Sequence, residues 1–244
     1  MDALNFQISM DDLIFYGTIA FGFGVIVLLY ILSKRTREDF IDAALALGFL
    51  STPGMTQNVH GAIEKFRAFD EKGMFGLGPV VQIGRSGFKL SVFNAGMRFS
   101  GSGDSSLTTI AHARLHDFSF PDFSLKTPAF VVFAMIRGVD DRPNRITFDG
   151  HPEFSKRLWL EGEDESAIRA LFTPRVLTYF EKKRKAWLRS GLNLGPINLG
   201  AKLPYLEARG NEIIFLFEGK VIAPKKLAQF IDDAVEVVRV FTRE

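Results

Sequence analysis

The feature that most constrains this chain is residues 13–32, a run of 20 residues without one charged side chain. A helix of that length, at about 1.5 Å per residue, is roughly 30 Å long, which is the thickness of a bilayer's hydrocarbon core. A helix buried in a soluble protein normally keeps a polar stripe, and this run has none. We therefore predict a single transmembrane helix near the N-terminus.

The charges on either side of this segment predict its orientation. Three Asp and no Lys or Arg occur in residues 1–12, whereas Lys34, Arg35 and Arg37 follow directly after it. Because basic residues stay on the cytoplasmic side, we expect an N-terminus outside the inner (cytoplasmic) membrane and a cytoplasmic domain. A cleaved signal peptide is the alternative, but it normally has a basic start, a shorter apolar run and a small-residue cleavage site.

The amino-acid composition excludes several kinds of functional site in the rest of the chain. Its 244 residues contain no Cys, which excludes disulfides, thiolate nucleophiles and cysteine metal ligands. The 25 Phe residues provide apolar mass for a well-packed core. The formal charge of +2 is modest, so nucleic acid is an unfavoured partner.

Patterns after the span predict an α+β domain. Phe40, Ala44 and Leu47 recur at helical spacing, which favours a short helix over residues 37–48 that ends at Gly48. Alternating, turn-bounded runs then indicate an antiparallel sheet. The expected strands are residues 80–83, 88–93, 107–118, 129–137 and 145–148, the first two forming a hairpin.

The last third of the chain alternates helices and strands. An acidic cluster at residues 161–165 precedes one helix, and Thr173-Pro174 caps a second helix that runs to Trp187. A hairpin at residues 205–217 and an amphipathic C-terminal helix from Pro224 follow. The apolar stripe of that helix, expected to pack on the sheet, consists of Leu227, Phe230, Ile231, Ala234, Val235, Val238 and Phe241.

This pattern predicts four parts along the chain. They are a non-cytoplasmic tail at residues 1–12, the span at 13–32, a helix and antiparallel sheet at 33–160, and an α/β lobe at 161–244.

Four short motifs are distinctive. They are Phe120-Pro121-Asp122-Phe123-Ser124-Leu125, His151-Pro152-Glu153-Phe154-Ser155, Leu160-Glu161-Gly162-Glu163-Asp164-Glu165 and, after the span, Leu47-Gly48-Phe49. The combination resembles a family of uncharacterised bacterial membrane-tethered domains over most of residues 40–244. The resemblance implies the fold class and the tether, but no activity and no site residues.

Two histidines have the i, i+4 spacing of a zinc-binding helix. Ala113, however, stands where metalloprotease chemistry needs glutamate between His112 and His116. The local pattern is that of a strand, on which the two side chains would be about 13 Å apart, too far to share a metal ion. We therefore expect a solvated strand face carrying His112, Arg114 and His116.

The glycine clusters at residues 73–78 and 101–106 lack the spacing or the lysine of nucleotide-binding loops, and we expect turns there. Asp140, Asp141 and Asp149 lie among Arg and Pro residues typical of a solvated loop. The sequence thus predicts no catalytic residue, no cofactor and no metal ion.

Small residues in the span are one candidate contact surface. Ala20 and Gly24 are four residues apart, and Gly17 lies nearby, so another helix could approach closely. A span that faces only lipid is the alternative, because small residues are common in membrane helices.

A basic run is the second candidate contact surface. Lys182, Lys183, Arg184 and Lys185 precede Trp187 at the end of a predicted helix. These residues would contact anionic lipid headgroups or an acidic partner, with Trp187 as an interfacial anchor. In the alternative interpretation they cover a solvated helix end and offset its dipole.

The sequence therefore predicts a non-catalytic accessory or scaffolding subunit. A single span would anchor it, and its cytoplasmic domain would bind a larger membrane protein assembly. The alternative is a membrane-attached enzyme with an Asp, Glu or His site that the sequence does not reveal.

Overall fold

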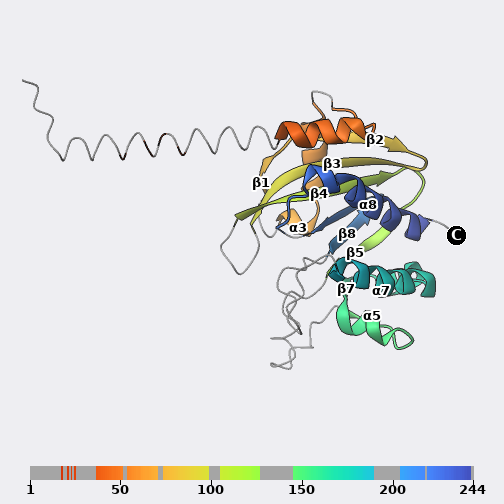
Figure 1. The fold of residues 1–244 in the computed structure, drawn as a ribbon. Coiled ribbons are helices and arrows are strands. Elements are labelled where there is room, and N and C mark those ends of the chain that lie inside the picture. Colours follow the sequence, from red (N-terminus) through yellow and green to blue (C-terminus); the bar gives the residue numbers. More distant parts are fainter. Residues whose placement is uncertain are drawn as a thin grey trace, which may run out of the picture.

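The computed structural model describes most of the domain and four residues of the N-terminal segment. The described residues are 37–51, 54–70, 74–98, 105–126, 145–189, 204–217 and 219–242, with Thr18, Phe21, Phe23 and Val25. They form an α+β fold in which one antiparallel sheet of nine strands carries helices on both faces (Figure 1).

The strands follow an order that differs from their order in the sequence. Along the sheet it is β1-β3-β4-β9-β8-β5-β7-β6, and β2 pairs with β3 beside β1. The strand bounds are β1 Met74–Leu77, β2 Val81–Arg85, β3 Phe88–Arg98, β4 Ser105–Leu115, β5 Phe120–Lys126, β6 Arg145–Ile146, β7 Trp159–Gly162, β8 Pro204–Gly210 and β9 Glu212–Phe217.

The helices form two layers on the sheet (Figure 1). Residues 37–46 form a helix at the start of the domain. The further bounds are α2 Met55–Ile63, α3 Arg67–Asp70, α5 Pro152–Arg157, α6 Glu165–Leu171, α7 Pro174–Arg189, the 3₁₀ turn η1 Pro224–Lys226 and α8 Leu227–Thr242.

Strand β9 shows why both faces of the sheet are covered. All six of its residues are buried, and the five apolar ones alternate between two cores. Ile213, Phe215 and Phe217 belong to the larger core beneath α7 and α8. Ile214 and Leu216 belong to the smaller core beneath α2 and α3. Because successive side chains of a strand point to opposite faces, a continuous apolar run requires this two-sided cover.

The hairpin of β8 and β9 joins the two halves of the sheet. β4 and β5 are consecutive in the sequence, yet β9 pairs with β4 and β8 pairs with β5 between them. The predicted boundary at residues 160/161 falls inside β7, and strands from both sides of it belong to one sheet.

Most predicted elements that fall on described residues are confirmed. The first helix buries Phe40 and Ala44 and ends two residues before Gly48, whose φ of 82° in the following turn is readily adopted by glycine. The β2–β3 hairpin, β4, α6, α7, β8 and β9 are present near their expected places. The C-terminal helix packs on the sheet through all seven predicted stripe residues, as expected.

Other expectations are wrong. Residues 73–78 were expected to be a turn, but they contain strand β1. His112 does not face solvent: it is buried under Phe66, on the face covered by α2 and α3. The sequence patterns also missed α2, α3, α5, β5 and β7. The predicted strand at 129–137 lies outside the described residues, as do Asp140 and Asp141.

Candidate functional site

Helices α7 and α8 lie side by side and carry most of the predicted contact residues. α7 buries Val176, Leu177 and Phe180 in the larger core. The basic run begins two residues after Phe180, and α8 lies close enough to supply acidic partners to it.

Lys183 is the centre of an ion-pair network between the two helices. Its Nζ lies 2.9 Å from Asp233 Oδ1 and also bonds to Glu236 on α8. Burial alone would lower the pKa of Lys183, but the hydrogen bonds to Glu236 and Asp233 raise it above its usual value. Lys183 therefore holds α7 to α8 and is not available as a free surface cation.

Trp187 is part of the core and not an anchor at the surface. Only 6% of it is exposed, and its ring lies 6.0 Å from that of Phe215. Its Nε1 donates a hydrogen bond to Asp233 Oδ2 at 3.3 Å, which satisfies the indole N–H inside the protein. The prediction that Trp187 is an interfacial anchor is therefore wrong.

The remaining basic residues of the run differ in exposure. Lys182 and Lys185 are exposed. Arg184 is half-buried, and burial together with the nearby charge of Arg157 lowers its pKa below the usual value. Lys182 and Lys185 are thus the part of the predicted run that is accessible to a partner.

A groove of about 490 Å³ runs between the same two helices. Its lining combines opposite charges with apolar side chains: Arg175, Tyr179, Asp232, Val235, Glu236, Arg239 and Val240. The Tyr179 hydroxyl is buried and has no hydrogen-bond partner among the described residues. Burial, with the carboxylates of Glu236 and Asp233, raises the pKa of Tyr179 far above its usual range, so the hydroxyl stays neutral.

A second polar region lies on the other face of the sheet, under α2 and α3. Residues paired directly across the strands form one row in which all but one are polar. Along the sheet the row is Gln82, Ser91, His112, Ile214, Glu207, Ser124, Glu161 and Arg145.

Glu207 fixes the start of α3 over this row. Its carboxylate accepts hydrogen bonds from the backbone N–H groups of Arg67 at 2.7 Å and Ala68 at 3.1 Å. The Tyr205 hydroxyl donates a third bond at 2.7 Å and Arg209 Nε a fourth at 3.1 Å. A buried carboxylate that accepts four hydrogen bonds serves to hold the fold together.

Glu212 fixes the turn around Lys65, which precedes α3, in a similar way. Its oxygens lie 2.5 Å from Lys65 Nζ and 2.5 Å from Arg114 Nε, and 3.8 Å from His112 Nε2. Burial alone would raise the pKa of Glu212, but His112, Lys65 and Arg114 together lower it to about 2. Glu212 is therefore ionised at neutral pH and is a poor general base.

His112 is the least satisfied residue of this region. Its side chain is 4% exposed, and neither ring nitrogen has a hydrogen-bond partner among the described residues. Within the described part of the chain, His, Asp and Glu do not form a group of three or more that could bind a metal ion. The polar residues on this face therefore serve to hold α2 and α3 on the sheet, and their geometry favours this role over catalysis.

The predicted contact residues of the span, Gly17, Ala20 and Gly24, lie outside the described residues. Four of their neighbours are described as helical, and three of these are large and exposed: Phe21 at 75%, Phe23 at 68% and Val25 at 39%. Among the residues that are described, the structure contains no helix both long and apolar enough to cross a bilayer.

Asp149, the described member of the predicted carboxylate loop, lies exposed in the turn after β6. Comparisons with protein-family models, with curated proteins and with solved structures find no match to this chain.

Proposed function

We propose that this protein is a single-pass, membrane-anchored accessory or scaffolding subunit whose cytoplasmic domain binds a larger membrane protein assembly. The observation that carries the proposal is the exposure of Phe21, Phe23 and Val25, each described as helical, within 20 residues that lack any charge. Aromatic and β-branched side chains exposed together need lipid or protein to cover them.

The polar groups of the domain favour binding over catalysis. Glu207 and Glu212 are buried carboxylates, the residue type that an acid–base enzyme would use. Both are occupied by backbone N–H groups or by cations that fix the α2–α3 layer. The exposed Lys182 and Lys185 and the groove between α7 and α8 are therefore the candidate contact region of this face.

A tether adds to the strength of such a contact. Confinement to the membrane raises the effective concentration of the domain near a membrane partner, so a small interface suffices. Lys182 and Lys185, which are exposed on α7, would meet an acidic surface of the partner. Ala20 and Gly24 would pack against one of its membrane helices.

The second candidate is a membrane-attached enzyme, favoured only by His112. A buried imidazole next to a carboxylate is a common acid–base arrangement, and both ring nitrogens of His112 lack a partner among the described residues. Against it, two cationic side chains, Lys65 and Arg114, already hold the Glu212 carboxylate in ion pairs.

Co-purification of the full-length chain in mild detergent tests the proposal. We expect a stoichiometric membrane partner that is retained at moderate salt and lost from a Lys182→Glu, Lys185→Glu variant. The matched control reverses Arg85 and Lys89, two exposed cations at the far end of the β2–β3 hairpin, and should keep the partner. A chain that purifies alone from its native membrane would contradict the subunit role.

A further inference from the structure

The segment between β9 and α8 is fixed on the first residues of β4. Gly219 N donates to Thr108 Oγ1 at 3.0 Å, and Lys220 O accepts from Thr109 N at 3.0 Å. Ile222 N donates to Thr109 Oγ1 at 2.8 Å. Three hydrogen bonds over four residues hold this segment in a defined position, although it belongs to neither a helix nor a strand.

The fixed segment presents apolar and basic side chains together. Val221 is 39% exposed and Leu107, on the adjacent β4, is 56% exposed. Lys225 and Lys226 follow in the η1 turn directly before α8, are both exposed, and have no acidic partner among the described residues. We call these four residues the end patch.

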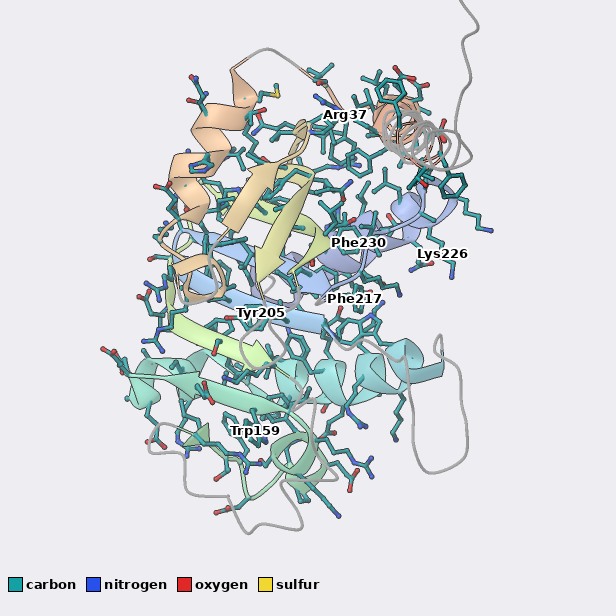
Figure 2. All side chains as sticks on the ribbon, turned by 90° about the vertical axis from the view of Figure 1, so that its left-hand side faces the viewer. Arg37, Trp159, Tyr205, Phe217, Lys226 and Phe230 are labelled. Carbon is teal, nitrogen blue, oxygen red and sulfur yellow. The ribbon has the colours of Figure 1, made fainter. Side chains whose placement is uncertain are left out.

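The end patch lies where the chain enters the domain. The helix at residues 37–46 begins at this end of the sheet, as does α8 (Figure 1). Figure 2 looks onto this end and shows Arg37 near the top and Lys226 lower on the right. Arg37 comes five residues after the uncharged segment ends at Leu32, so a membrane that holds this segment lies within a short linker of this end of the domain.

We propose that the end patch is a second membrane contact, in which Lys225 and Lys226 bind anionic lipid headgroups and Leu107 and Val221 enter the interface. Apolar side chains flanked by lysines are the usual composition of a surface that rests on a membrane. The proposal rests on the proposed membrane anchor. It replaces Trp187, which is buried, with residues that are exposed at the end of the sheet where the first helix begins.

The contribution of Lys225 and Lys226 to membrane association can be estimated. Each lysine near an anionic leaflet contributes a factor of about five to association, so two contribute roughly 30-fold. Because the contact is intramolecular once the span is inserted, it sets the fraction of molecules in which the domain rests on the bilayer.

The lack of cysteine in the chain permits a direct test in full-length protein. Val221→Cys carries an environment-sensitive fluorophore, and the protein is reconstituted in nanodiscs containing a headgroup spin-labelled quencher. Leu47→Cys is the matched control, because Leu47 is 38% exposed and Val221 is 39% exposed. Leu47 lies at the other end of the first helix, about 15 Å from Arg37 by helical rise.

We expect strong quenching at residue 221, weak quenching at residue 47, and a larger difference when anionic lipid is included. Lys225→Gln with Lys226→Gln should reduce the quenching at 221, whereas Arg85→Gln with Lys89→Gln should leave it unchanged. Equal quenching at 221 and 47 in a protein that has inserted would overturn the end-patch contact alone. A protein that does not incorporate into nanodiscs would overturn both this contact and the anchor.

Discussion

Phe230→Ala distinguishes a buried C-terminal helix from one that docks a partner. Phe230 is 3% exposed on α8, and its ring stacks on Phe215 with centroids 5.4 Å apart. The ring of Phe217 lies 6.1 Å away, beside it in Figure 2. Truncation removes the ring between helix and sheet, where the surrounding aromatic side chains can collapse only in part.

Cavity formation of this kind costs about 3 to 5 kcal/mol for Phe→Ala. At roughly 2 to 4 °C per kcal/mol for a domain of this size, we expect the melting temperature to fall by about 6 to 20 °C. Against an ordinary domain stability of about 5 to 15 kcal/mol, the loss would be large and easily measured.

The assay is a thermal melt of fragment 33–244, which contains every residue of the two described cores. Asp232→Ala is the control, because Asp232 is exposed on the same helix and its removal should change stability by less than about 0.5 kcal/mol. An unchanged melting temperature for Phe230→Ala, with a weakened complex, would refute the burial of α8 against the sheet.

Three further predictions concern other parts of the molecule. Gly162→Ala should destabilise the fragment by about 1 to 3 kcal/mol in a thermal melt, since a Cβ there would lie 2.5 Å from Asp122 O; Gly84→Ala, with open space around it, should not. The lowered pKa of Glu212 stabilises the fold above pH 4.5 by about 3 kcal/mol, an amount lost as pH falls toward 2. Melts between pH 7 and 2 should therefore show a flatter curve for Glu212→Gln, and parallel curves would contradict the ion-pair cluster. Gly24→Leu should release the membrane partner during co-purification while leaving insertion intact, and an unchanged partner yield would remove this helix face from the interface.

The spacing of apolar residues within a segment was enough to predict the helices and strands that bury a regular apolar face. The C-terminal helix and β9 are examples, because the spacing of their apolar residues is complete within each segment. β5 was missed because Pro121-Asp122 resembles a turn, whereas the structure has an irregularity in register between Phe120 and Phe123 that keeps the strand paired. Its place in the sheet depends on β8, which lies about 80 residues further along the chain.

The polar row under α2 and α3 was beyond sequence patterns for a similar reason. Glu207 and Glu212 stand in strands rich in apolar residues, which hints that they are buried and paired. The partners of Glu212, however, come from the turn around Lys65 and from β4, and two of the donors to Glu207 come from the start of α3. Only the tertiary fold brings these groups together. The basic run on α7 was visible in the sequence, but the inward direction of Lys183 and Trp187 was not, because it depends on the position of Asp233 on α8.

Both proposed contacts require that residues 13–32 cross the bilayer with the domain in the cytoplasm. The most direct measurement is a pair of reporters fused after Glu244, one active only in the cytoplasm and one only outside it, combined with alkaline extraction of the membranes. We predict activity of the cytoplasmic reporter alone, in a membrane fraction that resists extraction. Activity of the external reporter, or release of the chain at alkaline pH, would contradict the anchored cytoplasmic domain.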